Sequence, residues 1–420
     1  MRVRENRRTV RIFIIAISAL FFTGAVVFQD DGEAHVPSPA PNPFISKPAS
    51  AISLLANRYD SLLRSSMAQI NTVGAAVTIV KDGRVAMLKP YGVKKEGASE
   101  LVDVHTIFRM ASVSKGFAGV LAGILNRDGV VKLDDPVKNY IPGFRLKDTI
   151  NTNQLTIRNV LSHTSGLVPH AYDNLVEDKV PFNKILQSLD QVDIAAPPGK
   201  FYGYQNVVYS LYDPVVKNKT NLSYDQLLRD SVFKPLNMTD ASTGFEAFSR
   251  NPDKAFPHAR GRHHFFARPL NNRYYSTLPA AGVNASISDL SQWLLALLGN
   301  QPDVLDNQVL DTVFKPEIVT PLKWVYLHDW EGVTSKQYAL GWRVVGYRGH
   351  RILYHGGYVD GYKVEIALCR EANFGVAYVT NSPDGRTSNW IPEFLNMYFD
   401  TFSAKSLLSE TEATQVNPYP

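Results

Sequence analysis

The chain has 420 residues, of which 45% are hydrophobic and 20% charged, an ordinary globular composition with enough chain for one large or two moderate domains. Five arginines and one glutamate give the first eleven residues four of the five net positive charges, so the pI of about 9.0 does not indicate a nucleic-acid-binding surface. The single cysteine, Cys369, excludes an intrachain disulfide, and its place in an alternating apolar run favours a packing role.

The N-terminal region, residues 1–34, has the charge order of an export signal. Its arginines precede an uncharged run of 17 residues, from Ile12 to Phe28, and acidic residues follow. That length is just enough to span a bilayer, and no clear small-x-small cleavage site follows it. We therefore favour an uncleaved signal-anchor over a removed signal peptide. Glu5 and the long apolar block argue against a mitochondrial presequence. We expect the rest of the chain to lie at the periplasmic face of the inner membrane, or to be secreted.

Residues 35–49 carry five prolines and little apolar periodicity, which is typical of a stiff linker. The remaining chain is interpreted as a folded domain over residues 50–403, followed by a C-terminal tail over residues 404–420.

Within this domain the apolar spacing predicts a helix at each end, a hairpin after the first helix and four strands before the last helix. An amphipathic helix starts at Ser50, and a hairpin turns at Asp82-Gly83. The segment 170–280 reads as helical or irregular. The other expected elements are a helix from Ser112 to Asn126, a helix from Ser286 to Leu298 capped by Ser286 or Ser288, four antiparallel strands (Tyr338–Tyr347, Arg351–His355, Tyr362–Cys369 and Phe374–Thr380), and a last helix from Asn389 to Phe402.

Ser112 and Lys115 are the first candidate catalytic pair. Residues three apart in a helix share a face, so the Lys115 amine is expected beside the Ser112 hydroxyl. A serine hydroxyl needs a neighbouring base, and burial of a lysine favours its neutral, basic form. Free N–H groups of the first helical turn can also face a developing oxyanion.

Ser-x-x-Lys alone is weak evidence, because Ser231-Val232-Phe233-Lys234 matches it too. Pro235 follows directly and disfavours helical geometry at Lys234, so no long helix is expected to start at Ser231. We interpret this second match as accidental.

Two histidine-containing segments invite functional interpretations. His163, in Leu161-Ser162-His163-Thr164-Ser165-Gly166-Leu167, is assigned a structural role in capping or bridging a turn. The basic segment from His258 to Arg268 is compatible with a metal or an anionic polymer. It lacks paired acidic ligands, so a solvated loop is the preferred interpretation.

Three short motifs, taken in order, resemble those of the class C β-lactamase and penicillin-binding-protein superfamily. They are Ser112-Val113-Ser114-Lys115, Tyr204-Gln205-Asn206 and His355-Gly356-Gly357, and the Leu161–Leu167 segment and Pro279-Ala280-Ala281-Gly282 also look like the family. Tyr172-Asp173-Asn174 is a second Tyr-x-Asn. Tyr204 is preferred because Pro198-Gly199 turns the chain ahead of it and an apolar helix follows.

The resemblance covers residues 50–403 and implies an α/β fold of the α+β type. A mainly antiparallel sheet would be flanked by helices, a helical subdomain would be inserted at about residues 130–280, and the active site would lie between the two parts. No metal or organic cofactor is implied.

The family site, carried over residue by residue, implies an acyl-enzyme mechanism. Ser112 would be the nucleophile, and Lys115 with Tyr204 would take and relay its proton. Asn206 would bind the lysine or the substrate amide. The N–H groups of Ser112 and Tyr358 would form the oxyanion hole, with Tyr358 expected on an edge strand and with His355 and Gly357 flanking the substrate.

The substrate stays open, because this type of site serves β-lactamases, D,D-carboxypeptidases, D-amino-acid peptidases and carboxylesterases. The third motif begins with His355 where many β-lactamases have lysine, so we expect a neutral group facing the substrate's distal polar end, and a peptidase or esterase in preference to a strong penicillinase. No Ser-Asp-Asn and no Lys-Thr-Gly occur, which argues against class A. The expected partner is a small molecule or peptide, for example one derived from peptidoglycan. The alternative is an inactive relative that binds cell-wall peptides or acts as a scaffold.

Overall fold

The computed structural model describes residues 50–322, 327 and 330–414, with side chains described as far as residue 402. The signal-anchor and the linker expected before residue 50 lie outside this part of the chain. Within it, none of the helices has the length and apolarity needed to cross a membrane.

An eight-stranded antiparallel sheet forms the centre of the domain, in the order β2-β1-β13-β12-β11-β10-β9-β8. The predicted hairpin and strands are confirmed in kind, and the sheet gains β8 and β9 at one end. The strands are β1 (Gly74–Lys81), β2 (Arg84–Gly92), β8 (Ile318–Val319), β9 (Val333–Tyr338), β10 (Arg343–Tyr347), β11 (His350–Val359), β12 (Tyr362–Cys369) and β13 (Phe374–Thr380).

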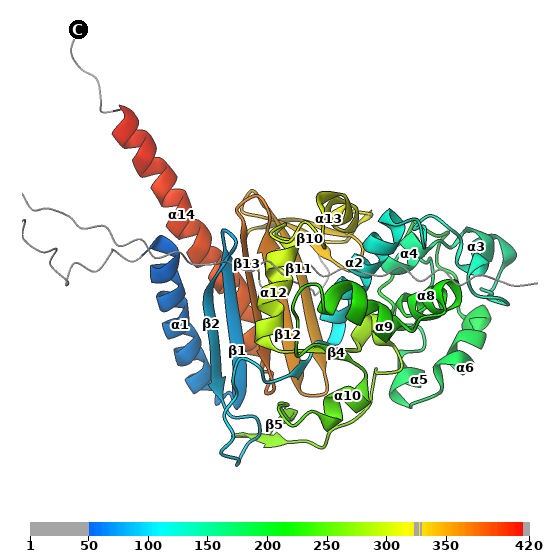
Figure 1. Cartoon of the computed structure of the whole chain (residues 1–420), viewed down its shortest axis with the longest axis horizontal. Helices are drawn as coiled ribbons and strands as arrows, with labels where there is room; N and C mark the ends of the chain where they lie inside the picture. Colours follow the sequence, from blue (N-terminus) through cyan, green and yellow to red (C-terminus); the bar gives the residue numbers. More distant parts are fainter. Residues whose placement is uncertain (1–49, 323–326, 328–329, 415–420) are drawn as a thin grey trace, which may run out of the picture. The chain divides into compact units, whose positions relative to one another are not determined.

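The terminal helices α1 (Ala51–Ile70) and α14 (Trp390–Thr414) pack together on one face of this sheet (Figure 1). Ser50 caps α1 by accepting a hydrogen bond from the Ser53 N–H, as its N-cap position predicts. Tyr59 of α1 meets Phe394 of α14 edge to face, with ring centroids 5.2 Å apart. The final helix is longer than expected and runs into the region assigned to a tail.

The opposite face of the sheet is covered by α12 (Ile287–Leu297) and, behind it, α2 (Ser114–Arg127). Ser286 is the N-cap of α12, where it forms a capping box with Asp289. Short strands β3 (Phe108–Arg109), β7 (Val283–Ala285) and β4 (Ser242–Thr243) form a separate small sheet beside them, and β5 (His258–Arg260) pairs with β6 (Phe265–Ala267).

The segment between about residues 130 and 280 is mostly short helices, most of which gather at the end of the domain away from α1 and α14 (Figure 1). Its status as a separate subdomain stays a prediction. The helices are α3 (Thr149–Gln154), α4 (Ile157–Leu161), α5 (Asp173–Glu177), α6 (Phe182–Gln187), α7 (Asn206–Tyr209), α8 (Tyr212–Thr220), α9 (Tyr224–Leu228) and α10 (Phe245–Arg250); α11 (Leu278–Ala281) and α13 (Asn307–Phe314) follow.

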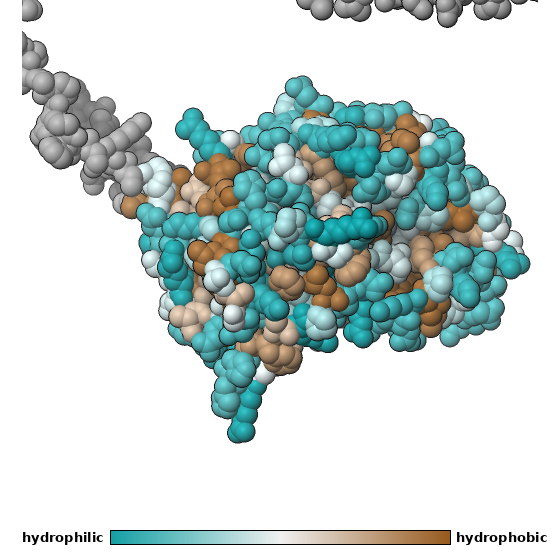
Figure 2. Space-filling model, turned by 60° about the horizontal axis from the view of Figure 1, so that its bottom comes forward, coloured by the Kyte–Doolittle hydropathy of each residue, from teal (hydrophilic) through white to brown (hydrophobic). Residues whose placement is uncertain are grey.

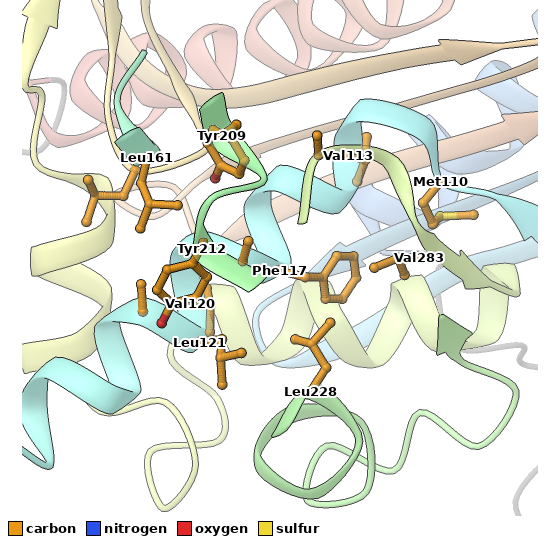
Figure 3. Packing of buried hydrophobic residues seen from close by; sticks show 14 of the residues in the cluster. Met110, Val113, Phe117, Val120, Leu121, Leu161, Tyr209, Tyr212, Leu228 and Val283 are labelled. Atoms are coloured by element: carbon orange, nitrogen blue, oxygen red, sulfur yellow. The ribbon is translucent and has the colours of Figure 1, made fainter. Parts of the chain in front are cut away.

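Helix α2 is buried on all sides from Ser114 to Leu125, because it lies between the sheet side and the short helices (Figure 3). Phe117 stacks on Trp293 of α12 with ring centroids 4.2 Å apart. Gly119 permits a backbone to approach closely, since a Cβ there would lie 2.0 Å from the carbonyl oxygen of Leu340. This contact fixes α2 against the loop between β9 and β10.

The strand expected over Tyr338–Tyr347 is interrupted. β9 ends at Tyr338 and β10 begins at Arg343, with Gly341 between them at φ +77°. A Cβ on Gly341 would lie 2.2 Å from the Lys115 carbonyl oxygen. The glycine therefore serves a turn that packs onto α2, and this tertiary contact overrides the local strand pattern.

The surface is predominantly hydrophilic on the face shown in Figure 2, where hydrophobic residues form separate patches. Single exposed apolar side chains such as Leu101, Ile150 and Val319 are ordinary for a folded domain.

Gly119→Ala should destabilise the domain by about 1–3 kcal/mol, because the added methyl group must push α2 away from Leu340. The free energy of unfolding in urea would measure the loss. Gly385→Ala is the matched control, since a Cβ at Gly385 meets nothing within 4 Å. Equal stability of the two variants would contradict the close packing described for α2.

Candidate active site

Ser112 lies in a 3₁₀ turn, Ala111–Val113, that leads into α2, so the helix begins two residues later than predicted. Ala111 adopts φ 45°, a left-handed conformation that a residue with a Cβ rarely takes. Gly357 of β11 packs against the turn, where a Cβ would lie 2.9 Å from the Ser112 nitrogen. Strand β11 thus abuts the nucleophile turn and leaves no room for a side chain there.

The Lys115 amine lies between three oxygen atoms. It is 2.8 Å from Asn206 Oδ1, 3.0 Å from the Ala280 carbonyl oxygen and 3.2 Å from Ser112 Oγ. The first two oxygens only accept hydrogen bonds, whereas the hydroxyl of Ser112 can also donate one. A neutral amine has two hydrogens and one lone pair, so its hydrogens bind the two carbonyl oxygens and its lone pair is left facing Ser112. The pair predicted from sequence is thus brought together as a nucleophile and a base.

Burial sets the charge of this amine. Lys115 is fully buried, and burial lowers its pKa to about 7, an effect that the Asp173 carboxylate opposes and the Arg343 guanidinium reinforces. A large share of the amine is therefore neutral near pH 7, as a general base requires.

Tyr204, in the loop before α7, donates a hydrogen bond from its hydroxyl to Ser112 Oγ at 3.0 Å. Burial raises the pKa of Tyr204 to about 12, although the bond to Ser112 and the charge of Arg343 lower it in part. Tyr204 thus keeps its proton at neutral pH, which leaves Lys115 as the candidate base at Ser112. His163 holds the neighbouring backbone, because its Nδ1 accepts a hydrogen bond from the Gln205 N–H at 3.2 Å.

Asn206 lies at the start of α7 and binds with both ends of its amide. Its Oδ1 accepts from Lys115, and its Nδ2 donates to Asp173 Oδ2 at 2.9 Å. The same carboxylate oxygen lies 2.8 Å from His170 Nδ1. The predicted contact between Asn206 and the lysine is therefore present, and Asp173 extends it.

The backbone of Tyr358 is directed toward the nucleophile turn by the strand register. Asp360 and Gly361, with φ 40° and 89°, form a two-residue turn that closes on the pair Val359–Tyr362. Tyr358 then faces Lys363 as a non-hydrogen-bonded pair, so its N–H points away from β12. Contrary to expectation β11 is not an edge strand, but its pairing with β10 ends at Tyr354 and leaves this part of the strand open toward Ser112.

His355 does not face the cavity as expected. Its side chain is completely buried, and its Nδ1 lies 2.9 Å from the Gly356 carbonyl oxygen, which can only accept. Nδ1 therefore carries the proton, and Nε2 accepts from the Tyr338 hydroxyl at 3.1 Å. Burial lowers the pKa of His355 well below its usual value. The expected neutral charge state fits, but both ring nitrogens are occupied by the protein itself.

Arg343, at the start of β10, brings a cation to the site, although the third motif has His355 where many β-lactamases have lysine. It lines a cavity of about 630 Å³ together with Ser112, Tyr204, Asn206 and Tyr358. Its guanidinium carbon lies 5.8 Å from the centre of the Tyr204 ring, and one Nη donates to the Tyr202 hydroxyl at 3.3 Å. His170 and Asp173 also line the cavity.

The sequence reasoning missed Arg343, His170 and Asp173 as site residues. Asp173 is the middle residue of the second Tyr-x-Asn, but only the tertiary fold shows that its side chain reaches Asn206. Arg343 had no local signal, since its position follows from the turn that interrupts the predicted strand.

Neither Tyr172 nor Ser231, the first residues of the two accidental motif matches, lines the cavity, although Asp173 of the first match does. The Tyr172 hydroxyl donates to the Ser188 carbonyl oxygen, and Ser231 lies in a π-helical turn, Arg229–Phe233. Lys234 does take helical dihedrals, against expectation, because it ends this turn rather than starting a helix, and its amine pairs with Asp230 at 2.9 Å.

A family model for Beta-lactamase matches residues 59–390. The chain belongs to the beta-lactamase family. Among similar proteins, Protein flp of Staphylococcus aureus (strain MRSA252) is 24% identical over 86% of this chain and 69% of its own length. The unguisins hydrolase ungD' of Aspergillus campestris is 25% identical over 82% of this chain and 65% of its own length. The octameric penicillin-binding protein homologue from Pyrococcus abyssi has the same fold, with a TM-score of 0.69, 22% identity, and 78% of this chain and 73% of that chain covered.

If Lys115 is the base, kcat/KM for an activated ester should rise with pH through a midpoint near 7. The sign follows from the lowered pKa: below the midpoint the amine is protonated and has no lone pair for the Ser112 proton. A pH series of initial rates measures the midpoint. A limb that rises only near pH 10, as for an exposed lysine, would contradict the buried neutral base.

Proposed function

We propose that this member of the beta-lactamase family is a serine hydrolase that acts on amide or ester substrates through an acyl-enzyme at Ser112. The observation that carries the proposal is the place of the buried Lys115 Nζ, 3.2 Å from Ser112 Oγ and within hydrogen-bond distance of the carbonyl oxygens of Asn206 and Ala280. The cavity next to Ser112 is of a size that suits a drug-sized molecule or a short peptide.

Acylation would proceed by attack of Ser112 Oγ on the substrate carbonyl carbon while the Ser112 proton passes to Lys115 Nζ. The developing oxyanion would accept hydrogen bonds from the N–H groups of Ser112 and Tyr358. Collapse of the tetrahedral intermediate would break the bond between the carbonyl carbon and the leaving amine or alcohol, which takes a proton from the Tyr204 hydroxyl. The Lys115 ammonium would then return a proton to the Tyr204 oxygen. An ester between Ser112 and the acyl group remains.

Deacylation would reverse these roles. Lys115, neutral again, takes a proton from water with Tyr204 as relay, and the resulting hydroxide attacks the ester carbonyl. Ser112 Oγ leaves and recovers its proton, and the carboxylic acid product is released. No step requires a metal or an organic cofactor.

The substrate class proposed here stays broad: a D-Ala-type peptide, a carboxylic ester or a β-lactam. The names of similar proteins point in several directions, since one is an unguisins hydrolase and another a penicillin-binding protein homologue. The neutral His355 gives no reason to disfavour carboxylate-bearing substrates, because Arg343 places a permanent cation in the cavity. A peptidoglycan-derived peptide, which ends in a carboxylate, therefore remains compatible with the site.

The purified domain should form a covalent adduct with a fluorophosphonate or a fluorescent penicillin, visible by intact-mass spectrometry. Ser112→Ala should abolish the adduct. Ser231→Ala, in the accidental Ser-x-x-Lys, is the matched control and should keep it. An adduct that persists in Ser112→Ala would falsify the assignment, and a folded wild-type protein that never reacts would favour the alternative of a non-catalytic binding protein.

We also propose that the enzyme works outside the cytoplasm, attached through residues 1–34. Support comes from the order of arginines, apolar run and acidic residues. In spheroplasts of a bacterial host the full chain should be degraded by added protease without lysis, with a cytoplasmic marker protein protected. A hydrolase domain that is protected from the protease to the same extent as the marker would contradict this proposal.

A further inference from the structure

The Asn206 amide controls what the Lys115 lone pair can do. With Oδ1 toward Lys115, the amide accepts a hydrogen from the amine and leaves the lone pair facing Ser112. With the amide rotated by a half-turn, an NH₂ group would face Lys115 and could donate to that lone pair. An amide has nearly the same shape in both orientations, so shape alone does not select one.

The charge and chemistry around the other end of the amide make the selection. Asp173 Oδ2 lies 2.9 Å from Asn206 Nδ2, and an ionised carboxylate only accepts hydrogen bonds. Rotation of the amide would bring Oδ1 against this carboxylate and replace a charge-assisted hydrogen bond with a repulsive contact between two acceptors. His170 Nδ1, 2.8 Å from the same oxygen, holds the carboxylate in place. Asp173 is half-buried at the start of α5, where its position is set by the fold and not by the nucleophile helix.

We propose that Asp173 is a positioning residue that locks the orientation of the Asn206 amide and thereby keeps the Lys115 lone pair available to Ser112. The inference rests on the proposed serine hydrolase mechanism. It adds to that mechanism a residue that lies outside the three sequence motifs and touches neither Ser112 nor Lys115 through a hydrogen bond.

The lock has an electrostatic side effect that an experiment can detect. The Asp173 charge raises the pKa of Lys115, against the larger lowering caused by burial. Removal of the Asp173 charge, with the hydrogen bond from Asn206 Nδ2 to residue 173 kept, should lower the pKa of Lys115. The titratable and charged groups that face the amine from the elements around it are Tyr204, Tyr209, Asp173, Arg343, His163 and His355.

Two variants separate the effect of the hydrogen bond to Asn206 from the effect of the Asp173 charge. Asp173→Asn keeps a carbonyl oxygen that can accept from Asn206 Nδ2 and His170 Nδ1, but it removes the charge. Asp173→Ala removes both. Asp178→Asn is the matched control, because it neutralises an exposed carboxylate just after the same helix and away from the cavity.

The rate at which a fluorophosphonate phosphonylates Ser112 with loss of fluoride, measured from pH 5 to pH 10, should distinguish the three. Asp173→Ala should lose about tenfold to a hundredfold of the plateau rate, a part of what general base catalysis contributes. Asp173→Asn should keep most of the plateau and shift the midpoint to lower pH by at least about half a unit. Asp178→Asn should match the wild type.

The inference is overturned if Asp173→Ala keeps the wild-type plateau. It is also overturned if Asp173→Asn and Asp173→Ala lose the same rate with an unchanged midpoint, as a merely structural role would produce. Should Asp173→Ala fail to fold, the retained plateau and shifted midpoint of Asp173→Asn still decide. Failure of the underlying mechanism looks different, since the wild-type protein itself would then not react.

Discussion

The structure depends on one buried amine. Placing an unpaired ammonium group away from water costs several kcal/mol, and a protein avoids that cost by letting the group lose its proton. At Lys115 burial lowers the pKa to about 7, so a large share of the amine is neutral near pH 7, with its two hydrogens bound by Asn206 and Ala280. The direction of the remaining lone pair is then a matter of geometry, and it falls on Ser112. The basicity that the proposed mechanism requires of Lys115 thus follows from how α2 is buried.

That burial has structural requirements of its own. A helix that is covered on every side needs neighbours that come close to its backbone, and α2 meets them through Gly119 and the carbonyl group of Leu340. The turn at Gly341 sits against the carbonyl group of Lys115 itself. Core packing and the chemistry of the site are therefore two aspects of the same contacts.

Much of the fold and the centre of the site followed from local sequence signals. The hairpin at Asp82-Gly83 and the capped helix after Ser286 were predictable because turn and cap chemistry act over a few residues. Ser112, Lys115, Tyr204 and Asn206 were found through motif order, and the structure brings their side chains together. The break between Tyr338 and Arg343 was not predictable, since it depends on the packing of this turn against α2, more than two hundred residues earlier in the chain.

The position of charge was the least predictable property of the site. A motif aligns a residue type with a place in the chain, but the reach and direction of its side chain depend on the neighbours. His355 turns to Tyr338 and Gly356, whereas Arg343 on the neighbouring strand β10 lines the cavity, as Arg273 also does. The site around Ser112 thus keeps a positive charge although the motif that usually supplies it does not.

The cavity has walls of two different kinds. One wall is the turn before α2 with β10 and β11, which belong to the main sheet and its core; the other includes α5, a helix of five residues between loops. Asn174 and Glu177 of α5 are exposed and can change without disturbing the core, although Val176 of the same helix is buried in it. Changes in the first wall alter the packing of the main sheet. We expect substrate range in such a scaffold to diverge through exposed positions of α5 other than Asp173, so that a lineage can acquire new specificities while the proposed nucleophile, the proposed base and the fold stay the same.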